Sequence, residues 1–175
     1  MATHSWQHRA AEIEPTLRIA CIDSPPAAAD TVRGVIFLIH GFPQTSYQFR
    51  HVIEPLSPAG YRVIAPDCRG AGASSKPPDG FTKTTMTQDL VRLLDVLGVT
   101  EPVHVVGHDI GGMIAYDMAA RYSSRVASVN WGECPLRETP NVLPTSKSDL
   151  VAVEQRTPYI SSTSSSTAYR TWLSL

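Results

Sequence analysis

The chain lacks features that mark several common classes of protein. It has no excess of basic residues, because 15 Lys and Arg stand against 16 Asp and Glu in 175 residues. A general nucleic-acid binder needs such an excess to neutralise phosphates. No stretch approaches the roughly 18 apolar residues of a membrane span, and the N-terminus has no apolar signal segment. We therefore expect a cytoplasmic protein that binds neither nucleic acid nor a membrane.

Cysteine is scarce and irregularly spaced. The three cysteines, Cys21, Cys68 and Cys134, are odd in number and form no C-x-x-C pair. The sequence therefore indicates neither a disulfide framework nor a zinc site. We expect three reduced thiols, no metal, no cofactor and a small, uncharged molecule as the partner.

Glycine and histidine are absent from the end of the chain. All 11 Gly lie at or before Gly132 and all six His at or before His108, whereas 18 of the last 43 residues are Ser, Thr or Pro. Such a segment has little apolar surface to offset the entropy of ordering. We divide the chain into one globular domain, residues 1–136, and a divergent Ser/Thr-rich tail, residues 137–175, which we expect to be mostly disordered.

Short apolar runs alternate with amphipathic helical patterns before that boundary. The expected strands lie at residues 34–40, 61–66, 103–106 and 126–131, the expected helices at 46–59, 82–97 and 115–122, and an antiparallel lead-in at 8–13 and 17–23. This alternation is typical of βαβ units in a mostly parallel sheet with helices on both faces. The predicted fold class is therefore α/β.

A glycine-rich turn follows the strand at 103–106 and opens a helix. Its residues are Gly107, His108, Asp109, Ile110, Gly111 and Gly112. A sharp strand-to-helix turn tolerates little side chain and presents its middle residue at the top of the sheet beside backbone N–H groups. Because Asp109 is that residue and a carboxylate attacks carbon to give an alkyl ester, the expected target is an electrophilic sp³ carbon. The alternative is that Asp109 only caps the helix that begins at Ile110.

Two more motifs follow neighbouring strands. They are His40-Gly41-Phe42-Pro43 and Asp67-Cys68-Arg69-Gly70-Ala71-Gly72-Ala73-Ser74. Carboxyl ends of strands are where ligands bind in open α/β sheets. With the turn around Asp109, these motifs resemble H-G-x-P, D-x-R-G-x-G-x-S and G-x-D-x-G of the α/β-hydrolases, in the epoxide hydrolase and haloalkane dehalogenase branch. The resemblance covers residues 6–136 and implies the α/β-hydrolase fold.

The resemblance also implies a site. Asp109 is the implied nucleophile, and the backbone N–H groups of Phe42 and Ile110 are the implied oxyanion hole. The side chains at these two positions supply neither a halide donor nor a cation. The resemblance therefore favours a small apolar epoxide over a haloalkane or fluoroacetate as the substrate.

Other motif residues are expected to be structural. His40 orders its loop, and Asp67 and Arg69 brace the next loop as a pair. His108 is expected to face away from the nucleophile and to pack. The remaining structural motif residues are Gly41, Pro43, Gly107 and Gly111.

The second half of the family pattern has no match. In this fold the chain order is nucleophile, acid, histidine, and no histidine follows Asp109. We therefore expect the lid, the last strands and the histidine base to be missing, and hydrolysis of the ester to a diol to be impaired. Glu133 stands where some relatives carry the acid, but without a histidine to orient we expect a loop carboxylate.

Three alternatives stay open. The first is a non-catalytic remnant or ligand-binding protein on a partial hydrolase fold, and the second is a haloalkane dehalogenase-like hydrolase. The third is an interaction module that self-associates through an exposed sheet edge. The abrupt departure from the family after Leu136 is typical of a shifted reading frame, a splice product or a pseudogene.

Overall fold

A mixed, mostly parallel sheet of seven strands organises the protein, in the order β1-β2-β4-β3-β5-β6-β7. The computed structural model describes residues 6–27, 32–133 and 160–163. The strands are β1 (Gln7–Glu14), β2 (Leu17–Ser24), β3 (Gly34–Ile39), β4 (Tyr61–Pro66), β5 (Val103–His108), β6 (Val126–Gly132) and β7 (Ile160–Thr163). β2 pairs antiparallel with β1 and β4, and the other pairings are parallel. The predicted α/β class is confirmed.

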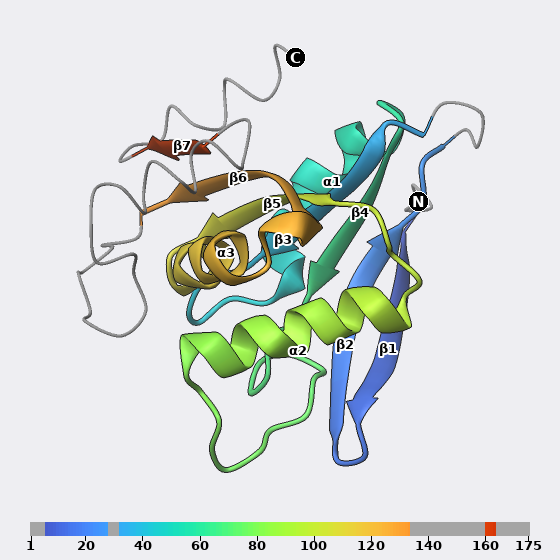
Figure 1. Ribbon diagram of the computed structural model, residues 1–175. Coiled ribbons are helices and arrows are strands. Elements are labelled where there is room, and N and C mark those ends of the chain that lie inside the picture. Colours follow the sequence, from blue (N-terminus) through green and yellow to red (C-terminus); the bar gives the residue numbers. More distant parts are fainter. Residues whose placement is uncertain (1–5, 28–31, 134–159, 164–175) are drawn as a thin grey trace.

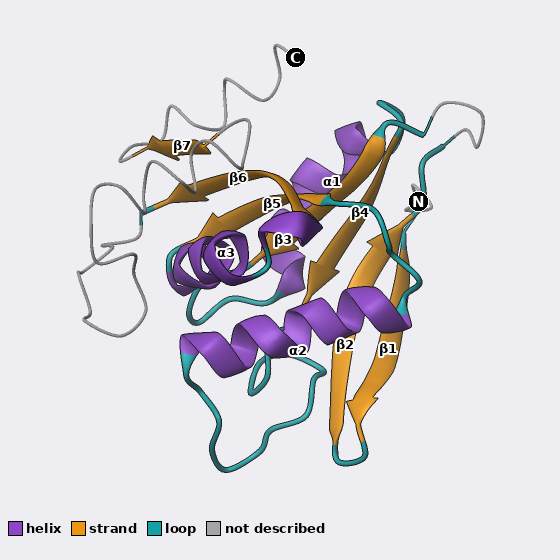
Figure 2. Cartoon of the chain, viewed as in Figure 1, coloured by secondary structure: helices purple, strands orange, loops and turns teal. Residues whose placement is uncertain are grey.

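Helices cover both faces of this sheet. They are η2 (Ser46–Phe49), α1 (Arg50–Leu56), α2 (Lys83–Val96), α3 (Ile110–Arg121) and η3 (Ser123–Arg125). Figure 1 and Figure 2 show α2 and α3 side by side on one face, with α1 behind the sheet. In the described residues no helix is both long enough and apolar enough to cross a membrane.

The central strand β3 contributes to a core on each face. Phe37 packs in the cluster that includes Leu93 of α2 and Ile114 of α3. Its neighbour Ile36 packs with Ile53 of α1 on the opposite side. Alternate residues of a strand point to opposite faces, so an almost wholly apolar β3 is what a sheet covered on both sides requires.

Several element boundaries differ from those predicted. β5 runs on to His108, so the turn residues Gly107 and His108 belong to the strand. The expected helix at 46–59 is a short 3₁₀ turn followed by α1, which contains Pro55 and ends at Leu56. A proline inside a helix removes one backbone hydrogen bond, which accounts for the short length of α1.

Most of the predicted tail, residues 137–159 and 164–175, lies outside the described residues. Within it, residues 160–163 form β7 in parallel register with β6. The sequence does not predict this strand, because Ile-Ser-Ser-Thr shows no apolar alternation. For the rest of the tail, the expected lack of order stays a prediction.

Candidate active site

The three motifs of the sequence meet at the carboxyl ends of three neighbouring strands. The first follows β3, the second follows β4, and Asp109 follows β5. β3 pairs in parallel with both β4 and β5. The carboxyl ends of these strands therefore bring the motifs together.

Asp109 occupies an uncommon backbone conformation between β5 and α3. Its φ is 52° and its ψ is −123°, a region that residues other than glycine rarely adopt. Its side chain makes no capping hydrogen bond to α3. Instead, Oδ2 accepts a hydrogen bond of 2.9 Å from the backbone N–H of Phe42. The alternative that Asp109 only caps the helix is therefore wrong.

Glycines let the backbone approach closely around this turn. A Cβ on Gly107 would lie 2.2 Å from the carbonyl oxygen of Gly111, and a Cβ on Gly111 would lie 2.2 Å from that of Ile39. A Cβ on Gly41 would lie 2.8 Å from the Cβ of Asp109. Any side chain at these positions would displace α3 or Asp109.

The two backbone N–H groups implied as an oxyanion hole belong to Phe42 and Ile110. That of Phe42 already donates to the Asp109 carboxylate, although the Phe42 side chain is 78% exposed. Ile110 is the first residue of α3, so its N–H has no partner within the helix. The Phe42–Pro43 peptide is cis, and the N–H of Gln44 donates to the Gly41 carbonyl at 3.0 Å across this turn. Such groups can stabilise negative charge next to Asp109.

His40 joins the loops after β3 and β4. Its Nε2 accepts a hydrogen bond of 3.0 Å from the N–H of Cys68, and its Nδ1 lies 2.8 Å from the carbonyl oxygen of Gly41. These partners require a neutral ring that carries its proton on Nδ1. Burial lowers the pKa of His40, although the Gly41 carbonyl and the charge of Asp67 act in the opposite direction.

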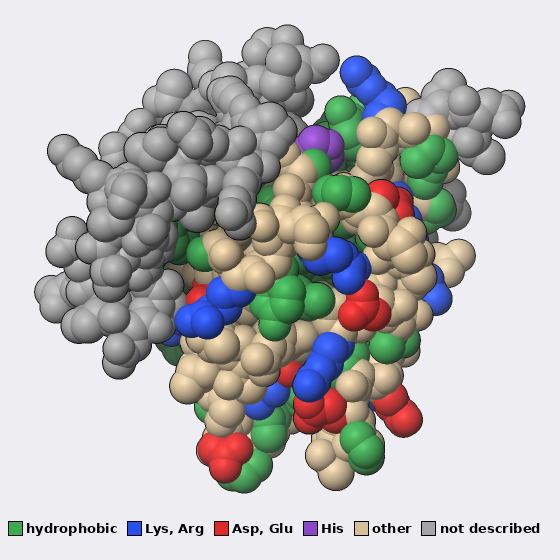
Figure 3. Space-filling model, in the orientation of Figure 1, with side chains coloured by type: hydrophobic (Ala, Val, Ile, Leu, Met, Phe, Trp, Pro, Cys, Tyr) green, Lys and Arg blue, Asp and Glu red, His purple; other side chains and the backbone are tan. Residues whose placement is uncertain are grey.

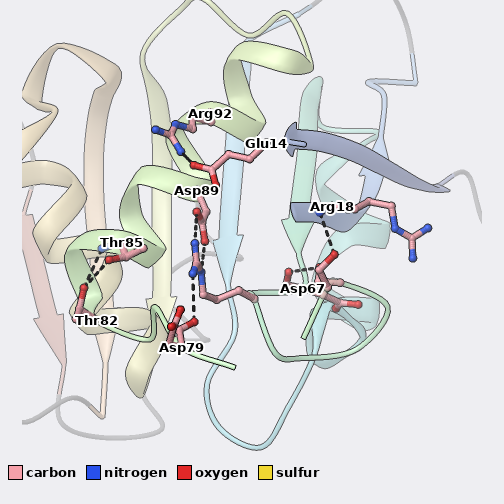
Figure 4. Close-up of polar contacts among 11 residues, drawn as sticks. Glu14, Arg18, Asp67, Asp79, Thr82, Thr85, Asp89 and Arg92 are labelled. Carbon is pink, nitrogen blue, oxygen red and sulfur yellow. Dashed lines mark hydrogen bonds and ion pairs between the residues drawn. The ribbon is translucent and has the colours of Figure 1, made fainter. Parts of the chain in front are cut away.

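Asp67 and Arg69 do not pair with each other, so the predicted brace between them is wrong. Asp67 accepts hydrogen bonds from the N–H groups of Ser46 at 2.8 Å and Ala73 at 2.9 Å. Arg69 instead pairs with both carboxylate oxygens of Asp89 on α2, at 2.5 and 2.7 Å. Figure 4 shows Asp89 on its helix, apart from Asp67. The hydrogen bond with Asp89 raises the pKa of Arg69.

His108 and Glu133 meet at the ends of β5 and β6. The two strands are in register there, and the N–H of Asp109 donates to the Gly132 carbonyl at 3.0 Å. His108 Nε2 lies 3.4 Å from Glu133 Oε2, with side chains 26% and 63% exposed. Glu133 has a positive φ of 54°. A histidine thus lies within reach of Glu133, which the sequence did not predict.

The position of the other ring nitrogen of His108 also differs from the prediction that this side chain faces away from Asp109. Nδ1 is buried, and it has no hydrogen-bond partner among the described residues. It lies 3.0 Å from the position that a Cβ on Gly41 would occupy, and Asp109 Oδ2 lies 3.1 Å from the same point. His108 therefore does not face away from Asp109. The separate contact between His108 and Glu133 depends on the register of β5 on β6, which the sequence did not predict.

Charge is mixed on the face of the protein that Figure 3 shows. On the face in Figure 3, Lys and Arg side chains are interspersed with Asp and Glu side chains over the described residues, in keeping with the net charge of −1. No group of His, Cys, Asp or Glu in that part of the chain is arranged to hold a metal ion. The described site therefore offers a carboxylate, backbone donors and a histidine–carboxylate pair as its chemical groups.

Comparisons with known proteins agree with this architecture. The family model described as alpha/beta hydrolase fold matches residues 34–130, and the chain belongs to this family. It is 41% identical over 113 residues to epoxide hydrolase A of Mycobacterium tuberculosis, a match that covers 63% of this chain and 35% of that protein. The chain is thus epoxide hydrolase-like in sequence.

Solved structures give the same result. The crystal structure of epoxide hydrolase A from Mycobacterium thermoresistibile matches with a TM-score of 0.65 and 35% identity, over 73% of this chain and 39% of that one. The haloalkane dehalogenase DatA from Agrobacterium tumefaciens C58 matches with a TM-score of 0.63 and 28% identity, over 76% and 43%. The chain thus spans less than half the length of these relatives.

Proposed function

We propose that this chain opens epoxides with Asp109 as the nucleophile and forms an alkyl–enzyme ester. The observation that carries the proposal is the 2.9 Å hydrogen bond from the Phe42 N–H to Asp109 Oδ2. It orients the carboxylate of Asp109, which does not cap its helix. This carboxylate lies at the carboxyl ends of the parallel strands, where ligands bind in open α/β sheets. The epoxide hydrolases among the relatives support the substrate class.

The proposed chemistry has two steps. One oxygen of Asp109 attacks a ring carbon, the ring C–O bond breaks, and the released oxygen takes a proton from water. Water then attacks the carbonyl carbon of the ester, and the N–H groups of Phe42 and Ile110 stabilise the oxyanion. Because no histidine follows Asp109 in the chain, we propose that this second step is impaired.

We propose selectivity for epoxides because a departing halide would find no side-chain donor at two positions beside Asp109. Phe42 and Ile110 are apolar there. Ring strain drives the opening of an epoxide without such a donor. The dehalogenase among the structural relatives makes haloalkanes the second candidate substrate. Halide release from 1-chlorobutane by the wild type, above that of Asp109→Ala, would favour the second candidate.

Intact-protein mass spectrometry after exposure to styrene oxide tests the proposal. We expect a single adduct that maps to the peptide containing Asp109 and is absent from Asp109→Ala. Asp79→Ala, at an exposed aspartate, is the matched control and should still form the adduct. A wild type that forms neither adduct nor diol would contradict the proposal and favour a non-catalytic remnant or ligand-binding protein.

Two further predictions from the sequence remain proposals. We propose a cytoplasmic location, supported by free, buried thiols at Cys21 and Cys68. We also propose that copies of the chain associate through a sheet edge, since β1 and β7 are the outermost strands and outer strands can pair with another chain. Sedimentation that stays monomeric over a hundredfold range of concentration would contradict this association.

A further inference from the structure

The described histidines differ in whether they can serve as a base near Asp109. Both ring nitrogens of His40 are engaged, by Cys68 and Gly41. His104 is the second residue of β5, at the opposite end of that strand from Asp109, and bonds to Ser128 at 2.7 Å. His8 lies on β1 and His51 on α1. His108 is the one among these five that directly precedes Asp109 and keeps an unpartnered nitrogen.

That nitrogen and the Asp109 carboxylate both approach the backbone of Gly41. His108 Nδ1 and Asp109 Oδ2 lie 3.0 and 3.1 Å from a single point, the position of a Cβ that Gly41 lacks. A buried polar atom without a partner is uncommon and costs free energy. The absence of a side chain on Gly41 thus leaves both groups facing the same small space.

Glu133 determines which ring nitrogen of His108 carries the proton. Its carboxylate oxygen lies 3.4 Å from Nε2, and a negative charge there favours an N–H at that nitrogen. The neutral ring then keeps a lone pair on Nδ1. A carboxylate that orients a histidine in this way is the arrangement that prepares a general base beside a nucleophile.

We propose that His108, oriented by Glu133, is the base that hydrolyses the alkyl ester on Asp109. The inference rests on the proposed function. His108 Nδ1 takes a proton from water while the water oxygen bonds to the ester carbonyl carbon. The tetrahedral oxyanion collapses, the bond from that carbon to the alkyl oxygen breaks, and the leaving oxygen takes the proton back from Nδ1. A diol and a protonated Asp109 result, and the carboxylic acid then gives its proton to water, which restores the carboxylate.

The burial of Nδ1 predicts that this step is slow. The atom is shielded from solvent in the free protein, so a water molecule must enter beside Gly41 before the base can act. Glu133 is 63% exposed, so it orients His108 weakly. Both properties agree with an impaired second step and still give that step a route.

The test separates formation of the ester from its decay. The 175-residue protein is alkylated with styrene oxide and desalted. The adduct is then followed by intact-protein mass spectrometry while the diol is quantified. We expect His108→Gln to form the adduct at about the wild-type rate and to lose it at least tenfold more slowly, since a general base contributes roughly 10²- to 10⁴-fold. Glu133→Gln should slow the decay by a smaller factor, and Glu133→Asp should restore part of the rate.

Matched controls identify the histidine and the carboxylate that act. His51→Gln and Glu12→Gln change exposed residues on α1 and β1 and should decay at the wild-type rate. A merely structural role of His108 would slow formation and decay together. If His108→Gln does not fold and takes up no adduct, the decay rate of Glu133→Gln decides, because that side chain is exposed and its removal spares the fold.

The failures of the two proposals are distinguishable. A wild-type adduct that never decays, or a His108→Gln adduct that decays at the wild-type rate, overturns the role of His108 and leaves Asp109 as the nucleophile. Unchanged decay in Glu133→Gln overturns the orienting role of Glu133. The absence of both the adduct and the diol in the wild type overturns both proposals.

Discussion

The two sides of the candidate site are held in very different ways. On the side of β3, β4 and β5, glycines place backbone against backbone, and a buried Arg69–Asp89 pair anchors the loop after β4 to α2. On the side of β6, the exposed Glu133 makes one contact with His108 at 3.4 Å. The first side holds Asp109 and the Phe42 N–H, whereas the second contributes Glu133, the carboxylate that we propose orients His108.

This difference separates the two proposed chemical steps. A nucleophile must be held in position to react, and Asp109 is confined by its neighbours on several sides. The contact between His108 and Glu133 is longer than that between Arg69 and Asp89, and its side chains are much more exposed. Its geometry therefore depends on fewer interactions. We therefore expect substitutions on the first side to affect stability and alkylation, and those at Glu133 to affect ester decay.

The largest loss of stability is expected for Arg69→Met. Asp89 is 1% exposed, and removal of its partner leaves a buried charge uncompensated, which costs about 3–5 kcal/mol. Arg92→Met is the control. Arg92 pairs with Glu14 (Figure 4), both side chains are exposed, and such pairs contribute about 0–1 kcal/mol. Urea unfolding measures both, and equal losses in the two variants would contradict this expectation.

Gly111→Ala should have the next largest effect. Its Cβ would lie 2.2 Å from the Ile39 carbonyl oxygen, and overpacking of this kind costs about 1–3 kcal/mol. Because the clash displaces α3 against β3, alkylation of Asp109 should also fall. Gly98→Ala has φ of +70° and no atom within 4 Å, so it should lose roughly 1 kcal/mol and alkylate normally. Normal alkylation in Gly111→Ala would show that the turn tolerates the shift.

Acid should weaken the loops around His40 by a smaller amount. Burial lowers the pKa of His40 from its ordinary value of 6.5, so the unfolded chain binds the proton more readily. The contribution of neutral His40 to the free energy of unfolding is therefore fully present above about pH 6.5. It is lost as the pH drops through the lower pKa of the folded state. Urea unfolding from pH 8 to pH 5 measures this slope.

A variant identifies the source of that slope. His40→Gln should flatten it, and the part that remains should come from His104, whose pKa burial also lowers. His51→Gln, at an exposed histidine, should leave the slope unchanged. A slope of wild-type size in His40→Gln would assign the effect to other groups.

The smallest effect on stability is expected for Glu133→Gln. The side chain is 63% exposed, and surface substitutions usually change stability by less than about 0.5 kcal/mol. Thermal unfolding at pH 7 measures this change beside that of the Glu12→Gln control. A loss of about 2 kcal/mol or more would show that the β6 side of the site is held as firmly as the other side.

Local patterns in the sequence predicted most of the fold. The expected helix at 82–97 is α2 at Lys83–Val96, and the expected antiparallel lead-in is the pair β1 and β2. These elements follow from apolar periodicity over a few turns or alternating residues. The three motifs were also visible, because glycines, a histidine and an aspartate at short spacings define each strand end.

The pairing of charged groups could not be predicted in the same way. Asp67 stands two residues from Arg69, yet Arg69 bonds to Asp89, which is twenty residues away on α2. Asp67 was already engaged by nearby backbone N–H groups. Sequence distance says little about contacts between a loop and a helix, because helix packing on the sheet determines which face of α2 meets the loop.

The sequence by itself determined the α/β class, the order of the motifs and the place of Asp109 in the turn between β5 and α3. Each of these depends on neighbours along the chain. Only the tertiary structure decided that His108 meets Glu133, because this contact needs β5 and β6 in register. It also decided that Ile160–Thr163 pairs with β6. Strand pairing joins residues that are distant in the chain, and no local periodicity encodes the partner.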